Sequence, residues 1–141
     1  MAERRYAIVV ATFYRELADS LVRSAHEALP GEPEVFEVPG AFELPLAASY
    51  AALSGRFAGV VCLGAVIRGE TDHYDWVCAE CARGIQDVQL RTGVPCSFGV
   101  LTVDSMQQAI ARAGGDQRDS ARNAAEAVLA LAALREQLAC G

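Results

Sequence analysis

Four short apolar segments, each followed by a stretch with helical spacing, constrain the fold of this chain more than any other feature. The apolar segments cover residues 5–11, 35–38, 59–67 and 94–102. Continuous apolar runs of this length are typical of strands that are buried on both faces. Strands that alternate with helices of ten or more residues indicate a parallel sheet covered on both sides. We therefore expect an α/β fold, a three-layer α/β/α sandwich with a four-stranded parallel sheet.

Five helices are expected between and after these strands. The first covers residues 16–29, the second 41–53, and a long third helix ends near residue 92. A short helix that Asp104 or Ser105 can cap ends near Arg112, residues 114–116 (GGD) break it, and a final helix covers 119–138. The chain has 141 residues, with no internal repeat or low-complexity linker, so we expect one domain over residues 1–141.

The basic residues exclude several classes of function. All 12 are arginines, which excludes a lysine Schiff base, a Walker-A lysine and a lysine general base within the chain. A net charge of −6 with scattered arginines argues against nucleic-acid binding. The apolar runs are shorter than the ~18 residues that a membrane span needs, and residues 1–5 lead directly into a strand-like run. We expect no membrane partner and no secretory signal.

The five cysteines, Cys62, Cys78, Cys81, Cys96 and Cys140, do not suggest a metal centre or a disulfide framework. Cys78 and Cys81 have CxxC spacing, but no second pair or histidine-rich segment completes a zinc site. An odd number of cysteines in apolar or helical settings favours buried, reduced thiols in a cytoplasmic protein. We expect no bound metal.

Parallel α/β sheets bind ligands outside the carboxyl ends of their strands. Three connections at that edge carry informative residues, namely 12–14, 39–43 and 68–73. In the third, Gly69 lets the backbone approach a ligand, and Thr71 supplies a hydroxyl and an amide at a helix start, which favours an anion. Arg112 or Arg68 could complement the anion. The alternative is an ordinary helix with Thr71 or Asp72 as its N-cap.

Four further side chains near this edge are candidates for a binding or catalytic role. His73 lies in the first turn of a helix, where the cationic imidazole is disfavoured and a neutral base is available, although many such histidines are structural. Glu43 could accept hydrogen bonds from a polyol or only favour the helix dipole. Phe13 and Phe98 are either core residues or, if exposed, surfaces on which a planar heterocycle stacks. His26, the second histidine, reads as a surface residue.

Several ordered stretches together resemble the lumazine synthase family. They are residues 38–45 (VPGAFELP) and 63–75 (LGAVIRGETDHYD), followed by 93–95 (GVP), 98–102 (FGVLT) and 108–114 (QAIARAG). The resemblance covers nearly the whole chain and implies a flavodoxin-like sandwich. It also implies a transferase of riboflavin biosynthesis that condenses 5-amino-6-(D-ribitylamino)uracil with 3,4-dihydroxy-2-butanone 4-phosphate, without a cofactor. An archaeal-type riboflavin synthase and a non-catalytic flavin-binding or shell-forming paralogue remain alternatives.

The resemblance also implies a role for each matching residue. Phe13 would stack on the pyrimidine, and His73 would transfer protons. The phosphate positions correspond to Glu70, Thr71 and Arg112, and a neighbouring subunit would supply Phe98. The ribityl chain and ring would be held by Ala41, Phe42 and Glu43, and the uracil edge would meet backbone groups of Ala65, Val66 and Ile67.

Some positions depart from the family pattern. Tyr14 stands where many members have Asn, and Arg122 replaces a common Lys in the loop over residues 114–123. Glu70 places a carboxylate beside the expected phosphate, so its side chain must point away. That loop is about two residues longer than in shell-forming members, and the extra segment that often precedes the first strand is lacking. We therefore expect a homopentamer, with active sites between subunits, rather than a 60-subunit shell.

Overall fold

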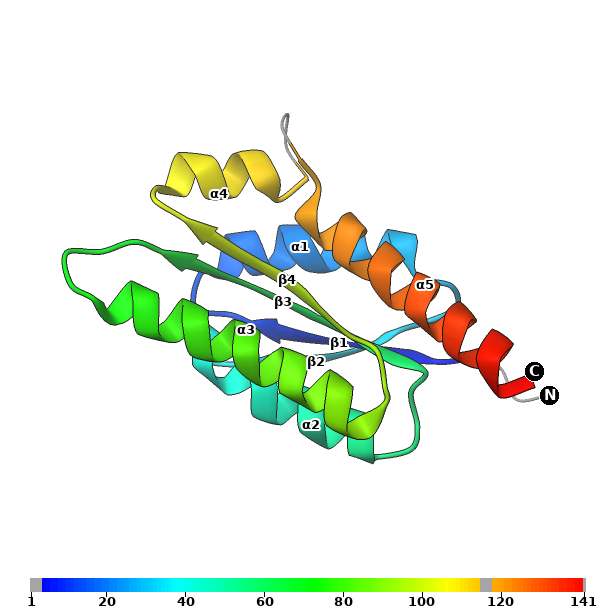
Figure 1. Ribbon diagram of the computed structural model, residues 1–141. Coiled ribbons are helices and arrows are strands. Elements are labelled where there is room, and N and C mark those ends of the chain that lie inside the picture. The colour runs from blue at the N-terminus through cyan, green and yellow to red at the C-terminus, as the bar shows by residue number, and fades with distance from the viewer. Residues whose placement is uncertain (1–3, 115–117, 141) are drawn as a thin grey trace.

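The computed structural model describes residues 4–114 and 118–140, which contain four strands and five α-helices. Helices and strands alternate along the chain (Figure 1), in the order expected from the sequence. The elements are β1 (Tyr6–Ala11), α1 (Arg15–Ala28), β2 (Glu34–Val38), the 3-10 turn η1 (Ala41–Glu43), α2 (Leu44–Leu53), β3 (Gly59–Ile67), α3 (His73–Thr92), β4 (Cys96–Val103), α4 (Met106–Arg112) and α5 (Ser120–Cys140).

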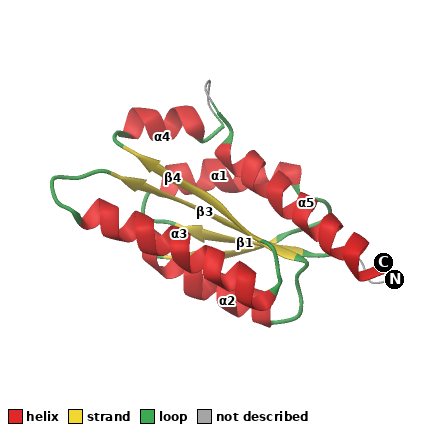
Figure 2. Cartoon of the chain, in the orientation of Figure 1, coloured by secondary structure: helices red, strands yellow, loops and turns green. Residues whose placement is uncertain are grey.

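The strands form one parallel sheet in the order β2-β1-β3-β4 (Figure 2). Val9 of β1 pairs with Phe36 of β2 on one side and with Cys62 of β3 on the other. The chain winds in opposite directions from β1 and β3, so a topological switch point lies between these two strands. The expected three-layer, flavodoxin-like α/β fold is confirmed.

Alternating strand side chains build two cores, one on each face of the sheet. Ile8 and Val10 of β1 are buried against α1 and α5, whereas Ala7 and Val9 are buried against α2 and α3. The period of two follows from the pleat of a strand, and a strand covered on both faces needs apolar residues at every position. In Figure 1, α1 and α5 lie above the sheet and α2 and α3 lie below it.

Gly99 lets α5 approach the sheet closely. A Cβ atom at this position would lie 2.7 Å from Leu63 Cδ2 and 2.9 Å from Ala124 Cβ. Atoms of these kinds do not pack so closely, so only glycine fits here without a shift of the surrounding structure. The small residue in β4 and the small Ala124 of α5 together bring this helix onto the sheet.

The element boundaries lie within one or two residues of the expected ones, except at the start of the second helix. The helix expected over residues 41–53 begins with the 3-10 turn η1, in which Glu43 Oε1 accepts a hydrogen bond from the Gly40 N–H at 2.9 Å. The fourth strand begins at Cys96, two residues later than expected, and ends one residue later at Val103. Ser105 is the N-cap of α4, because its Oγ accepts a hydrogen bond from the Gln108 N–H at 3.2 Å.

Three of the cysteines lie in the core, as expected. Cys62, Cys81 and Cys96 are buried on the α2–α3 side of the sheet, and Cys78 is partly buried. The break expected after α4 extends to residues 115 and 116, which lie outside the described residues. Among the described helices, none combines the length and the apolar character that crossing a membrane requires.

Candidate active site

A cavity of about 570 Å³ opens at the carboxyl ends of β1, β2 and β3. We call it the switch-point cavity. It is lined by the segments that follow β1 and β2, by the end of β3, and by the first turns of α3. Its volume suits a small organic molecule, and its position is the one at which parallel sheets bind ligands. The full lining is Phe13, Tyr14, Gly40, Ala41, Phe42, Glu43, Ala65, Val66, Ile67, His73, Trp76 and Val77.

Eight of the twelve residues singled out from the sequence line this one cavity. They come from four separate parts of the chain, which the parallel sheet brings to a single edge. Thr71 and Glu70 lie in the exposed loop just before α3, and Phe98 and Arg112 line other cavities. The eight are Phe13, Ala41, Phe42, Glu43, Ala65, Val66, Ile67 and His73.

Three large aromatic side chains at the switch-point cavity are exposed. Phe13 is 74% exposed, Phe42 60% and Trp76 69%. Exposed aromatic surface gathered around a cavity is typical of a binding site, and such rings stack readily on planar ligands. Trp76 was not singled out from the sequence, although its position three residues after His73 on the same helix is a usable signal.

The hydroxyl of Thr71 and the backbone of His73 form a hydrogen bond at the start of α3. The His73 N–H donates to Thr71 Oγ1 at 3.3 Å. Asp72 is the N-cap by backbone position, but its side chain makes no capping hydrogen bond. The side chain of His73 is exposed at the cavity, where it can reach a bound molecule. The arrangement gives a proton-transfer group and the positive end of a helix in adjacent positions.

Glu43 has a structural role that the sequence left open. Its Oε1 accepts the hydrogen bond from the Gly40 N–H at 2.9 Å and closes η1. The carboxylate has a second oxygen, and Glu43 is exposed at the cavity. The same side chain can therefore shape the turn and accept a hydrogen bond from a ligand hydroxyl.

Arg68 is already held by neighbouring groups. Its Nε donates to Asp104 Oδ1 at 2.9 Å, and its Nη1 lies 3.6 Å from Asp75 Oδ1. The guanidinium also lies 4.2 Å from the centroid of the Tyr74 ring. The hydrogen bond to Asp104 raises the pKa of Arg68, so the guanidinium stays protonated. Of the two arginines proposed to bind an anion, Arg68 is the one whose charge is balanced within the chain.

Arg112 is the other candidate for binding an anion, and part of its guanidinium is available for a further hydrogen bond. Its Nη1 is buried and has no hydrogen-bond partner among the described residues. A buried guanidinium nitrogen without a partner is unfavourable, and a bound anion would satisfy it. Arg112 lines a cavity of about 470 Å³ together with Arg68, Thr102 and Arg118, and this is not the cavity that contains His73.

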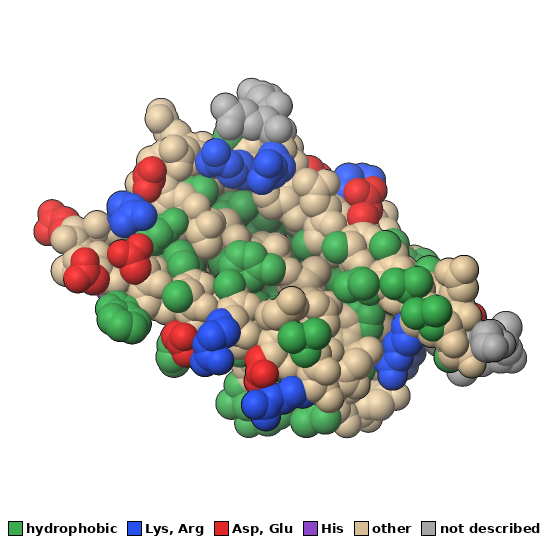
Figure 3. All heavy atoms as spheres, viewed as in Figure 1, with side chains coloured by type: hydrophobic (Ala, Val, Ile, Leu, Met, Phe, Trp, Pro, Cys, Tyr) green, Lys and Arg blue, Asp and Glu red, His purple; other side chains and the backbone are tan. Residues whose placement is uncertain are grey.

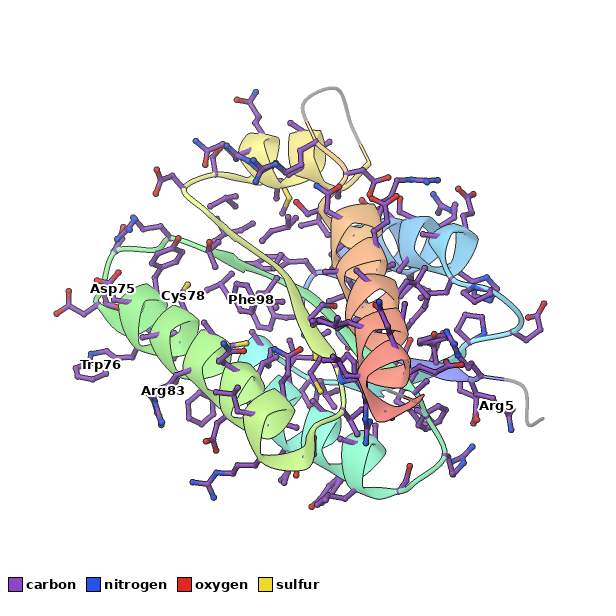
Figure 4. The ribbon with its side chains drawn as sticks, turned by 45° about the vertical axis from the view of Figure 1, so that its right-hand side comes forward. Arg5, Asp75, Trp76, Cys78, Arg83 and Phe98 are labelled. Carbon is purple, nitrogen blue, oxygen red and sulfur yellow. The ribbon has the colours of Figure 1, made fainter. Side chains whose placement is uncertain are left out.

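Phe98 lies on the edge strand β4, where it is 41% exposed. It lines a groove of about 570 Å³ between α3 and α5, whose apolar lining includes Ile85 and Leu131. Figure 3 shows hydrophobic side chains gathered in the hollow on this face, and Figure 4 shows Phe98 well separated from Trp76. Within one chain, Phe98 and His73 therefore do not share a cavity.

A doubly wound parallel sheet, with a cavity of aromatic residues, a carboxylate and a histidine at its switch point, is typical of α/β enzymes that act on small molecules. Comparison with known families makes the assignment specific. The family model described as "6,7-dimethyl-8-ribityllumazine synthase" matches residues 3–136.

Curated relatives agree with the family match. A 6,7-dimethyl-8-ribityllumazine synthase of Desulfatibacillum aliphaticivorans is 43% identical, over 95% of this chain and 90% of the relative. One of Paenarthrobacter aurescens is 46% identical, over 96% and 87%, and one of Ruthia magnifica is 40% identical, over 98% and 89%. The chain belongs to the 6,7-dimethyl-8-ribityllumazine synthase family, and the family and enzyme class expected from the sequence are confirmed.

Proposed function

We propose that the chain condenses 5-amino-6-(D-ribitylamino)uracil with 3,4-dihydroxy-2-butanone 4-phosphate, giving 6,7-dimethyl-8-ribityllumazine, phosphate and two molecules of water. The observation that carries the proposal is the meeting of Phe13, Glu43 and His73 in one switch-point cavity of about 570 Å³. These residues follow three different strands, so a ring-stacking surface, a hydroxyl acceptor and a proton-transfer group surround the same space.

The pyrimidine ring lies against Phe13 with its polar edge toward the end of β3. The pairing of β1 with β3 ends at Val10 and Leu63, whereas β3 continues to Ile67. The backbone groups of residues 65–67 that face the β1 side therefore lie beyond the ladder between these strands. Unpaired N–H and C=O groups are suited to the alternating donors and acceptors of a uracil.

The ribityl chain extends over η1. The exposed carboxylate of Glu43 accepts hydrogen bonds from its hydroxyl groups, and Ala41 and Phe42 supply the adjoining surface. Because Glu43 is also hydrogen-bonded to the Gly40 N–H, the carboxylate is oriented before the substrate arrives. Such preorganisation lowers the entropy that is lost on binding.

The phosphate group of the second substrate binds at the loop before α3. Thr71 supplies its hydroxyl and amide, and the backbone of Glu70 contributes while its carboxylate points to solvent. The guanidinium of Arg112 completes the site, since its Nη1 lacks a partner among the described residues. A bidentate arginine suits phosphate well.

His73 transfers protons during imine formation and the loss of phosphate. The uracil substrate supplies the amine nucleophile, so the reaction needs no lysine, and the chain has none. Much of the rate enhancement comes from holding two small reactants in contact. The residues of the site supply acid–base and electrostatic catalysis, and the proposal includes no cofactor or metal.

The complete site forms between subunits of a homopentamer. Phe98 and Arg112 lie at or beside the edge strand β4 and do not line the cavity of their own His73. The exposed apolar groove at β4 is a surface suited to a second copy of the chain. A ring in which this edge meets the switch-point cavity of the next subunit unites all twelve residues. Sedimentation should give a mass of about five chains, and about sixty would exclude this assembly.

The buried cysteines support a cytoplasmic location. Burial raises the pKa of the Cys81 and Cys96 thiols to about 12, which keeps them protonated and unreactive. Reduced, buried thiols are usual in proteins of a reducing compartment.

The function is tested by mixing the purified protein with both substrates and recording the absorbance and fluorescence of the lumazine product. The proposal predicts product well above the spontaneous background. An archaeal-type riboflavin synthase would instead form riboflavin from lumazine alone. A non-catalytic paralogue would bind lumazine or a flavin without forming product.

A further inference from the structure

Tyr14 borders both the switch-point cavity and a second, larger cavity. The second cavity, of about 740 Å³, lies between α1 and α4, and its lining includes Ser20, Ile110 and Gly114. We call it the α1–α4 cavity. Of the residues that the structure describes, Tyr14 is the one that lines both. A single residue is thus shared by the linings of a candidate substrate site and an adjoining open space.

Tyr14 is held at the start of α1, and its side chain packs against the core. The Tyr14 C=O accepts a hydrogen bond from the Ala18 N–H at 2.9 Å, which places the residue at the start of α1. Its side chain is partly buried against the core on the α1–α5 face. Partial burial restricts the conformations of the ring more than full exposure would.

Tyr14 also contacts Phe13. The two ring centroids lie 4.9 Å apart with an interplanar angle of 81°, an edge-to-face arrangement. Phe13 is otherwise largely exposed, so this contact restrains a side chain that has few other neighbours. Edge-to-face pairs are a preferred geometry for aromatic rings and therefore orient each other.

We propose that Tyr14 is a specificity-determining and positioning residue, which closes the pyrimidine site toward the α1–α4 cavity and orients the Phe13 ring for stacking. This inference rests on the proposed synthase function. Removing the Tyr14 ring joins the two cavities and frees Phe13. The pyrimidine then binds more weakly, and the site accepts larger analogues that the wild type rejects.

The test compares Tyr14→Ala with the wild type and with two matched variants. Tyr14→Phe keeps the ring, and Tyr50→Ala makes the same truncation on α2, at a residue that lines neither cavity. For Tyr14→Ala we expect the KM for the ribitylaminouracil to rise about tenfold, from the loss of the aromatic contact and the restraint on Phe13. The KM for the butanone phosphate and kcat should change by less than about threefold.

Two ribitylaminouracil analogues extend the test to selectivity. One carries a phenyl group at the end of the ribityl chain and the other on the ring. Tyr14→Ala should bind at least one of them about tenfold better, relative to the unsubstituted substrate, than the wild type does. Tyr14→Phe and Tyr50→Ala should retain the wild-type preference. If Tyr14→Ala does not fold, Tyr14→Leu serves the same purpose, because it keeps apolar packing but lacks a ring edge.

The outcomes separate this inference from the proposed function. Suppose that the wild type is active and that a variant without the Tyr14 ring keeps the wild-type KM for the pyrimidine and the wild-type analogue preference. This result overturns the role of Tyr14 and leaves the proposed function standing. An equal rise in the KM for both substrates also overturns it, because that indicates a general disturbance of the site. A wild type that makes no lumazine overturns the proposed function itself.

Discussion

The backbone N–H of His73 donates a hydrogen bond to Thr71 Oγ1 at 3.3 Å, at the start of α3. This contact joins the expected proton-transfer residue to the loop that is proposed to bind phosphate. The hydroxyl stabilises the helix start, and its loss should displace both His73 and the loop before α3. The two roles inferred from the sequence therefore depend on one local structure.

Thr71→Val tests this dependence, because the substitution keeps the shape of the side chain and removes the hydroxyl. Loss of a single hydrogen bond typically costs about 1 kcal/mol, which corresponds to roughly a fivefold change in an equilibrium constant. We expect the KM for the butanone phosphate to rise by about this factor or more, and Thr71→Ser to retain wild-type binding. A wild-type KM in the valine variant would contradict the role of the hydroxyl.

His73→Ala tests proton transfer. General acid–base catalysis typically contributes about 10²–10⁴-fold, so kcat should fall within this range while the assembly stays intact. Steady-state kinetics and sedimentation on the same preparation check both points. His26→Ala, which removes the other histidine from α1, is the matched control and should keep its activity. Wild-type turnover in His73→Ala would remove the residue from the mechanism.

Arg112→Ala tests the phosphate site and its assembly from two subunits. We expect a rise of at least about tenfold in the KM for the phosphate substrate and little change for the uracil, since a charged hydrogen bond contributes about 1.5–3 kcal/mol. Arg83→Ala, whose guanidinium pairs with Glu80 on the surface of α3, is the control. An equal loss of affinity for both substrates would argue against a phosphate role.

Mixed assemblies extend the Arg112 test. Co-assembled His73→Ala and Arg112→Ala chains should regain activity, because some junctions then combine an intact His73 with an intact Arg112 of the neighbour. Each variant assembled alone should stay impaired. If the mixture is no more active than its components, the two residues belong to the same subunit's site.

The buried thiols predict a loss of stability at alkaline pH. Burial raises the pKa of Cys81 and Cys96 to about 12, and it also raises the pKa of Cys62, whereas an unfolded thiol has a pKa of about 8.5. The pKa of these thiols is higher in the folded than in the unfolded protein, so the buried neutral thiols contribute to stability fully below about pH 8.5. Their contribution to the free energy of unfolding is lost as the pH rises toward 12. Urea unfolding at several pH values measures it. Alanine at the three positions should make the free energy of unfolding decline less steeply above pH 9. An unchanged slope of this free energy against pH would exclude the thiols as the cause of the decline.

Gly99→Ala tests the close approach of α5 to the sheet. The added Cβ would lie 2.7 Å from Leu63 Cδ2 and 2.9 Å from Ala124 Cβ, so the core must shift. Overpacking of this kind typically costs about 1–3 kcal/mol in the free energy of unfolding. Gly69→Ala is the control for stability, since no atom lies within 4 Å of the added carbon. Equal stability of the two variants would show that α5 can move without cost.

Most of the fold could be predicted from the sequence because the strands are buried on both faces. The run over residues 59–67 is apolar at every position, and β3 has the same bounds. The start of β4 was predicted two residues too early, because Val94 and Pro95 are buried but precede the ladder. The turn η1 also escaped prediction, since it depends on a hydrogen bond between Glu43 and Gly40.

The lining of the candidate site could be predicted for residues that follow the ends of strands. It was harder to predict for residues whose position or pairing depends on tertiary contacts. Phe13, Glu43 and His73 each lie just beyond a strand, so the topology alone brings them together. Residue types and spacing alone left Arg68 and Arg112 as alternatives, and the family resemblance favoured Arg112. The carboxylates that hold Arg68 come from the start of α3 and the loop after β4, and no sequence pattern predicts this pairing. Trp76 was missed because an aromatic residue on an amphipathic helix is typical of a packing position, and only its spacing from His73 indicates the cavity.

Formation of lumazine, measured together with the release of phosphate, is the decisive assay for the proposed synthase activity. The purified chain, given both substrates, should produce 6,7-dimethyl-8-ribityllumazine and phosphate in equal amounts and far faster than the spontaneous reaction. His73→Ala should reduce both rates together. Product at the spontaneous rate only, from a correctly folded and assembled protein, would exclude the proposed synthase activity.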